Sequence, residues 1–147
     1  KAGVPGTGHE VSVRQVVKRI AHTIRVAGEA MGYFAGEAAQ IYEDELSYCL
    51  VHQIGAFNSP VWFNLGLYHE YGIRGSGGNF SWDAESRRIV EVGDAYVRPQ
   101  CSACFIQSVD DDLMSIFQLV KNEARLFKYG SGTGTNFSHI RARQEKL

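Results

Sequence analysis

The strongest constraint on the fold is the order of elements predicted over residues 102–137. The short apolar run SACFIQ, residues 102–107, is bounded by turn residues and is typical of a buried strand. The three aspartates at 110–112 supply a cap and favourable negative charge for a following helix. Gly130 ends that helix, and a second strand is predicted over residues 133–137. The apolar stripe of the helix is Leu113, Ile116, Phe117, Val120, Ala124 and Phe127. This order predicts the α/β class.

The first part of the chain predicts a pair of helices. Ser12 and Gln15 have the spacing of a capping box, and apolar residues recur at helical spacing from Val13 to about Gly32. A second helix is predicted over residues 38–54, with apolar residues on one side. These two helices are expected to form a hairpin.

The segment that follows the helices is aromatic and irregular. Residues 56–82 mix aromatic residues with Asn, Ser, Pro and Gly, which predicts a loop with a short turn of helix. Within it, Ser59 precedes a proline, so its backbone is held extended and its hydroxyl can face a fixed partner; an ordinary turn explains it equally well. Residues 87–97 alternate well enough for a strand or a hairpin arm around Gly93 and Asp94.

Composition excludes several classes of protein. The 147 residues carry a formal net charge of -1, so charge does not suggest binding to nucleic acid or to an acidic membrane surface. No apolar run approaches the roughly 20 residues that span a bilayer, and no signal peptide is evident, so a cytoplasmic location is expected. Neither end of the sequence resembles a domain edge, and we expect the chain to be part of a longer protein.

The cysteines leave three interpretations open. Cys101 and Cys104 lie three residues apart, but a structural zinc site needs about four ligands and the histidines lack finger-like spacing. A thioredoxin-like pair belongs at a helix N-terminus, whereas these residues precede a strand. Spacing alone favours a buried and inert Cys104, and Cys49 on an apolar helical stripe is expected in the core. Strand alternation places Cys104 and Ile106 on one face and Phe105 on the other.

The glycine-rich run GSGTGTN, residues 130–136, matches neither a P-loop nor a dinucleotide fingerprint. Its glycines at alternate positions remove side chains from one side of the chain, which permits close approach of a ligand. Arg141 is able to hold a phosphate through its planar guanidinium, although an arginine near a chain end is usually solvated.

Three long motifs taken together carry a family resemblance. AFNSPVWFN, PQCSACFIQSVDDDLMSIF and LFKYGSGTGTNFSHIR, in this order, resemble the N-terminal part of class II, adenosylcobalamin-dependent ribonucleotide reductases. The helical lead that begins SVRQVVKRIAHTI is similar to that family as well. The resemblance implies a ten-stranded α/β barrel, with a helical N-terminal region over residues 1–98 and the start of the barrel over residues 99–147.

The resemblance also implies chemistry for individual residues. The family replaces the ribose 2'-hydroxyl of ribonucleotides by hydrogen with a cysteinyl radical and a pair of redox cysteines. Cys104 matches the first cysteine of that redox pair, whose partner is expected further downstream. Ser59, Ser102 and Gly132 match positions at the substrate. Cys101 departs from the small residue expected at its position.

The same resemblance implies an allosteric effector site and a set of binding partners. Asp111 matches a contact to the sugar of a deoxynucleoside triphosphate effector, and Arg141 an arginine near its phosphates. The expected partners are ribonucleotide substrate, a thioredoxin-like reductant and possible formation of a homodimer, in a ribonucleoside-diphosphate reductase. Most cobalamin contacts are expected outside this chain, which by itself is not expected to reduce nucleotides. The alternatives are a non-catalytic nucleotide-binding or dimerisation module and a small CxxC redox or zinc protein.

Overall fold

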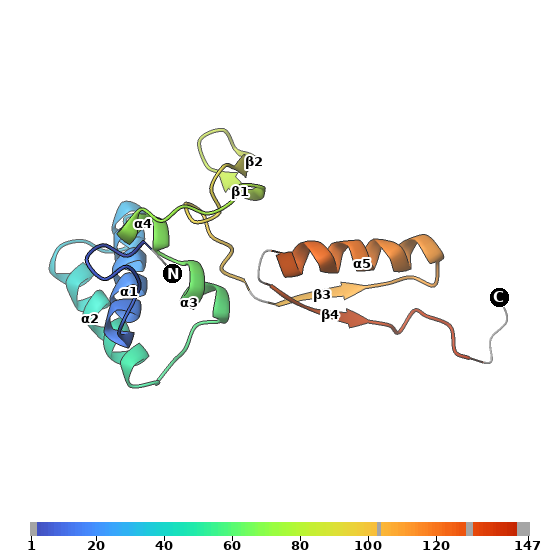
Figure 1. The fold of residues 1–147 in the computed structure, drawn as a ribbon, viewed down its shortest axis with the longest axis horizontal. Helices are drawn as coiled ribbons and strands as arrows, with labels where there is room; N and C mark the ends of the chain where they lie inside the picture. The colour runs from blue at the N-terminus through green and yellow to red at the C-terminus, as the bar shows by residue number, and fades with distance from the viewer. Residues whose placement is uncertain (1–2, 103, 129–130, 144–147) are drawn as a thin grey trace. The chain divides into compact units, whose positions relative to one another are not determined.

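The computed structural model describes residues 3–102, 104–128 and 131–143 (Figure 1). The chain divides into two compact units, Lys1–Cys101 and Ser102–Leu147. The first unit contains helices α1 to α4 and the strands β1 and β2, and the second contains β3, α5 and β4.

The first two helices form the predicted hairpin. Helix α1 spans Val13–Ala30 and helix α2 spans Glu37–Val51, so both predicted helices are confirmed. The capping box is present: the backbone N–H of Gln15 donates to Ser12 Oγ at 3.3 Å, and the backbone N–H of Ser12 donates to Gln15 Oε1 at 3.2 Å. The helices pack through a core cluster whose buried members are Val17, Ile20, Leu50 and Val61.

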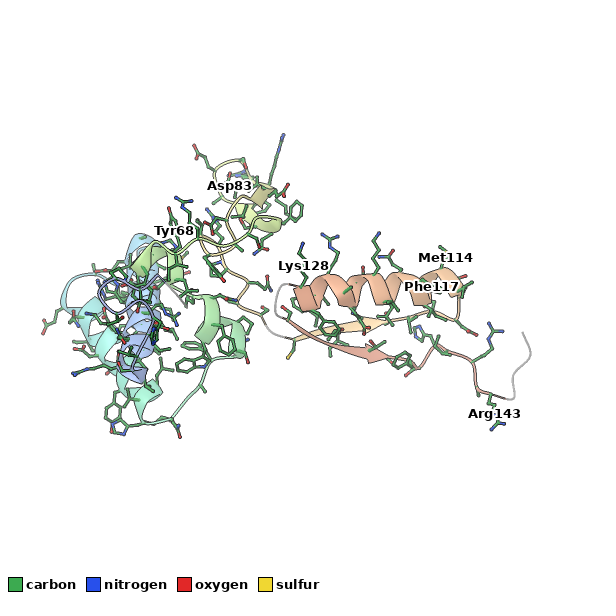
Figure 2. The ribbon with its side chains drawn as sticks, in the orientation of Figure 1. Tyr68, Asp83, Met114, Phe117, Lys128 and Arg143 are labelled. Atoms are coloured by element: carbon green, nitrogen blue, oxygen red, sulfur yellow. The ribbon has the colours of Figure 1, made fainter. Side chains whose placement is uncertain are left out.

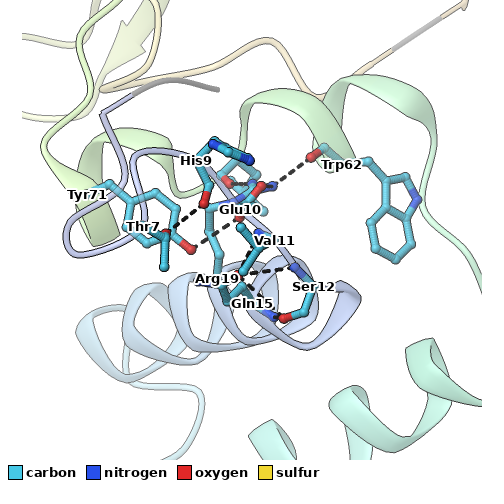
Figure 3. A network of polar contacts seen from close by, with 10 residues as sticks. Thr7, His9, Glu10, Val11, Ser12, Gln15, Arg19, Trp62 and Tyr71 are labelled. Carbon is cyan, nitrogen blue, oxygen red and sulfur yellow. Dashed lines mark hydrogen bonds and ion pairs between the residues drawn. The ribbon is translucent and has the colours of Figure 1, made fainter.

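Two short helices replace the single turn predicted in the aromatic segment. Helix α3 spans Ser59–Asn64 and helix α4 spans Leu67–Tyr71. Helix α3 is tied to α1 by the buried Arg19, which donates to the backbone carbonyls of Trp62, at 2.8 Å, and of Leu65, the residue that caps the end of α3 (Figure 3). Arg19 also pairs with Glu10 at 2.7 Å, so it joins the N-terminal segment to α1 and α3. The Tyr71 hydroxyl of α4 donates to the same Glu10 carboxylate at 3.2 Å.

Strands β1, Asn79–Asp83, and β2, Arg88–Val92, form an antiparallel hairpin. The strand or hairpin arm predicted within residues 87–97 is confirmed as β2, but the turn of the hairpin lies at residues 84–87 and not around Gly93 and Asp94. Asp83 Oδ2 accepts from the backbone N–H of Ser86 at 2.9 Å, which closes a tight turn at that point. Asp94 is instead buried beyond the hairpin.

The second unit is a single strand–helix–strand (βαβ) motif. Strands β3, Cys104–Ser108, and β4, Gly132–Asn136, pair in parallel, and α5, Leu113–Lys128, connects them and lies along the pair (Figure 1). The prediction of a buried β3 was wrong: within this unit α5 covers one face of the strand pair, and the other face is exposed. Cys104, Ile106 and Ser108 are exposed on the other face, and Ile106 is 83% exposed.

Helix α5 presents apolar side chains away from the strands as well. Met114 and Phe117, on its first two turns, are 71% and 62% exposed (Figure 2). Its start is fixed by Asp112, whose Oδ2 accepts from the backbone N–H of Ser115 at 2.9 Å. The predicted aspartate cap is therefore confirmed for Asp112.

Candidate functional site

The open face of β3 and β4 brings Cys104 beside Gly132. We define this face by the exposed residues of the two strands, which are Cys104, Ile106, Ser108, Gly132, Gly134 and Asn136. The parallel register pairs Cys104 with Gly132 and Ile106 with Gly134. Registered residues of paired strands point to the same side. The Cys104 thiol therefore neighbours a position with no side chain, and it is a free, exposed cysteine.

The glycines of β4 act through their missing side chains. Neither Gly132 nor Gly134 has positive φ, so backbone conformation does not require glycine at these positions. A Cβ at Gly134 would lie 3.5 Å from the Ile106 side chain, in ordinary contact. The inference that alternate glycines leave one side of the chain bare is confirmed for these two residues, and Gly130 lies outside the described residues.

Polar contacts hold the covered face of the sheet. Gln107 Nε2 donates to Thr133 Oγ1 at 2.8 Å, which ties β3 to β4. Thr135 Oγ1 donates to Glu123 Oε1 at 3.2 Å, which ties β4 to α5. These contacts fix the strand that carries Cys104.

The backbone carbonyl of Ser102 connects it to the start of β4. Its carbonyl accepts a hydrogen bond from Ser131 Oγ at 3.3 Å, and Ser131 is buried just before β4. This contact holds the segment before β3 next to the start of β4, so Ser102 lies at the same end of the strand pair as Cys104 and Gly132.

Cys101 lacks the features of an activated thiol. Its Sγ donates to the Pro99 carbonyl at 3.5 Å, and desolvation raises the pKa of the thiol. A nucleophilic cysteine of a redox motif needs a lowered pKa. The interpretation of Cys101 and Cys104 as a thioredoxin-like pair is therefore not supported by the chemistry around Cys101.

A second group of charged residues lies at the opposite end of the strands. The loop after β3 carries Asp110 and Asp111, and the segment after β4 carries His139 and Arg141. Arg141 Nε forms an ion pair with Asp111 Oδ2, and His139 Nδ1 lies 3.2 Å from Asp110 Oδ1. We call these four residues the carboxyl-end cluster.

The sequence predicted half of this cluster. Asp111 and Arg141 were each assigned to an effector site, and the structure brings the two into contact. Asp110 was predicted only as part of the helix cap, and His139 is one of the histidines whose spacing does not match a zinc finger. The signal for their contact was their place in the sequence, Asp110 directly before Asp111 and His139 two residues before Arg141, after two strands that prove to be parallel.

Ser59 belongs to the first unit. It is the first residue of α3, is exposed, and precedes the buried Pro60. Its extended neighbour is Asn58, with φ -71° and ψ 162°, whereas Ser59 begins the helix. The expectation of an extended backbone at Ser59 was therefore wrong, because proline at the second helical position is well tolerated.

Among residues 3–102, 104–128 and 131–143, no three His, Cys, Asp or Glu side chains gather in a way that could hold a metal ion. Within the same ranges, no helix is both long and apolar enough to cross a membrane.

Comparison with known proteins relates both units to one family. The profile described as "Class II vitamin B12-dependent ribonucleotide reductase" matches residues 1–53, and the "Ribonucleotide reductase, barrel domain" profile matches residues 102–147. A vitamin B12-dependent ribonucleotide reductase of Rhodopirellula baltica is 48% identical over 139 residues, which are 94% of this chain and 13% of that protein. One of Agrobacterium fabrum is 49% identical over 145 residues, which are 95% of this chain and 11% of that protein.

A more distant relative extends over nearly the whole chain. The vitamin B12-dependent ribonucleotide reductase of Streptomyces coelicolor is 43% identical over 147 residues, covering 99% of this chain and 12% of that protein. The chain thus spans only 11% to 13% of the length of these relatives. The resemblance found in the sequence is confirmed: this chain belongs to the class II, vitamin B12-dependent family of ribonucleotide reductases.

Proposed function

We propose that this chain is part of a cytoplasmic ribonucleoside-diphosphate reductase that uses adenosylcobalamin to make 2'-deoxyribonucleotides. The observation that carries the proposal is the placement of Cys104 on the open face, beside Gly132. There, the Cys104 thiol lies next to the backbone of Gly132, which has no side chain, on a strand held by contacts on the covered face of the sheet. In the complete protein, these strands would be the first of a ten-stranded barrel.

Cys104 acts as one of two reducing thiols. The ribose carbon loses its 2'-hydroxyl as water and gains hydrogen, while two thiols give up two electrons and two protons and become a disulfide. The second thiol is a cysteine further along the longer protein, and a thioredoxin-like protein then reduces the disulfide. Because β3 is hydrogen-bonded to β4, which itself packs against α5, Cys104 is held on a fixed strand.

The substrate ribose is proposed to lie against the open face. Gly132 lets the nucleotide approach the β4 backbone, and Ser102 lies at the same end of the strands. Ser59, the first residue of α3, is proposed as a contact to the substrate phosphate because of the family resemblance of its motif. The open face has room for a bulky ligand because Gly132 and Gly134 carry no side chains, which fits a site shared by nucleotide and cofactor.

Adenosylcobalamin supplies the radical that starts the reaction when it is bound. We propose that most of its contacts come from the remainder of the longer protein. The part of this chain in the site positions Cys104 and the ribose, which limits side reactions of the radical.

The carboxyl-end cluster is proposed to bind a deoxynucleoside triphosphate effector. Asp111 would accept from the effector sugar, and Arg141 would contact its phosphates. The exposed apolar side chains of α5 are compatible with a homodimer.

Replacing Cys104 with serine in the complete reductase tests the catalytic assignment. Cys104→Ser should abolish multiple turnovers with a recycling dithiol, while cleavage of the cobalt–carbon bond continues. Cys101→Ser is the matched control and should retain turnover, because desolvation raises the Cys101 pKa and disfavours its thiolate. Turnover by Cys104→Ser at the wild-type rate would remove Cys104 from the mechanism.

A non-catalytic nucleotide-binding module is the second candidate. The observation in its favour is that the whole carboxyl-end cluster lies within residues 102–147. This alternative predicts that the chain by itself binds a deoxynucleoside triphosphate. It also predicts that the longer protein that contains the chain does not reduce ribonucleotides. Calorimetric titration together with a turnover assay separates the two functions.

A further inference from the structure

The two basic residues of the carboxyl-end cluster, His139 and Arg141, come from one short segment. Asn136, the last residue of β4, accepts through Oδ1 from the backbone N–H of Ser138 at 3.0 Å. The backbone N–H of Ile140 then donates to the Phe137 carbonyl at 3.0 Å, which closes a turn. His139 and Arg141 extend from this turn toward the loop after β3.

Each of the two basic residues already has a carboxylate partner. The Arg141 and Asp111 side chains are 32% and 30% exposed, and the His139 and Asp110 side chains are 63% and 80% exposed. Ion pairs with this much exposure are weak: the attraction favours the paired over the separated side chains by a factor of about five at most. A strongly charged anion is therefore able to compete for both basic side chains.

A bound polyphosphate cannot simply be added to this arrangement. Asp110 and Asp111 carry negative charge directly beside the basic groups that an anion would need, and like charges repel. The phosphate oxygens must replace the carboxylates as partners of Arg141 and His139. Arg141 is suited to this because its guanidinium binds phosphate through paired N–H donors.

We propose that the carboxyl-end cluster binds the polyphosphate group of a nucleoside triphosphate by exchange of ion-pair partners, with His139 as a second phosphate ligand beside Arg141. The inference rests on the proposed effector site and adds to it the role of His139 and the competing role of Asp110. Asp110 holds His139 in the absence of ligand and is displaced when phosphate binds.

The experiment measures the dissociation constant of inorganic tripolyphosphate for the complete reductase by calorimetric titration. This probe has no sugar, so a sugar contact through Asp111 does not affect its affinity. Asp110→Asn should tighten binding about two- to fivefold, because it removes the competing charge. His139→Ala should weaken binding at least about fivefold, through loss of a charge-assisted hydrogen bond. In the double variant, the gain from Asp110→Asn should disappear.

Asp112→Asn is the matched control. It removes the same charge from the same loop, but the Asp112 carboxylate accepts from the Ser115 backbone. An equal gain in Asp112→Asn would show a general electrostatic effect and overturn the exchange. Weaker or unchanged binding in Asp110→Asn would also overturn it.

A parallel titration with a deoxynucleoside triphosphate separates the two levels of inference. If the wild-type reductase binds no deoxynucleoside triphosphate, the effector site itself fails, and the exchange fails with it. If the nucleotide binds and Arg141→Ala weakens it, while His139→Ala and Asp110→Asn leave tripolyphosphate affinity unchanged, the effector site stands and the exchange is wrong.

Discussion

Replacing the buried Arg19 with methionine should destabilise the first unit more than any exposed charge change in it. The Arg19 side chain is 1% exposed and its partner Glu10 is 12% exposed. The variant removes contacts from Arg19 to both Glu10 oxygens, at 2.7 and 3.3 Å, and to the carbonyls of Trp62 and Leu65 (Figure 3). Methionine keeps the apolar part of the side chain, so the change isolates the charge and its hydrogen bonds.

The size of the effect follows from what remains behind. Glu10 would stay nearly buried without its cation, although Tyr71 still donates to it at 3.2 Å. Removing one member of a buried ion pair costs about 3–5 kcal/mol, a large part of the roughly 5–15 kcal/mol that stabilises a domain. The double variant Glu10→Gln with Arg19→Met should recover part of this loss, because no uncompensated charge is then buried.

Urea unfolding of the chain measures this loss. Trp62 contacts the same region, since its Nε1 donates to the Phe57 carbonyl at 2.8 Å, and a Trp82→Phe background leaves it as the single tryptophan reporter. Arg25→Met is the matched control on α1: Arg25 pairs with Glu43 and Glu29 but is 20% exposed, so we expect a loss of about 1 kcal/mol. A loss below about 1 kcal/mol for Arg19→Met would refute the reasoning.

Two other predictions concern the first unit. Backbone N–H groups of Gly75 and Tyr96 donate to Asp94 and hold its pKa below the usual range, so this stability is present above the ordinary aspartate pKa and is lost as pH falls through the lowered value. Asp94→Asn should therefore show a shallower fall of Tm below about pH 4 than wild type. Gly66→Ala should cost about 2–4 kcal/mol in urea unfolding, because φ is +80° and the new Cβ would lie 2.4 Å from Thr23 Oγ1. Gly72→Ala, with φ +67° and open space, should cost only about 1 kcal/mol; equal losses would contradict the steric argument.

Local sequence signals predicted the elements but not their surroundings. The capping box of α1 and the stripe of α5 are set by neighbouring residues, and both helices form as expected. The burial of β3 depends on what covers its second face, and residues 102–107 carry no information about that. The hairpin bend was misplaced because Gly93 and Asp94 have turn composition, whereas the Asp83 side chain closes the actual turn.

The candidate site shows the same division. Alternation correctly separated Cys104 from Phe105, because it is a property of a single strand. The neighbour relation between Cys104 and Gly132 depends on strand register, which joins residues that are 28 positions apart. The contact of His139 with Asp110 depends on parallel pairing and a turn after β4, so it was missed.

The two candidate clusters lie at opposite ends of one strand pair, and β4 reaches both. Cys104 and Gly132 begin the paired strands, and the carboxyl-end cluster follows their last residues, roughly 15 Å away for a five-residue strand. Polar contacts from Thr133 and Thr135 bind β4 to β3 and α5. Effector control of substrate choice requires an element with two arrangements that both sites bias. Partner exchange at His139 and Arg141 would supply the two arrangements, and β4 would carry the change to the backbone beside Cys104.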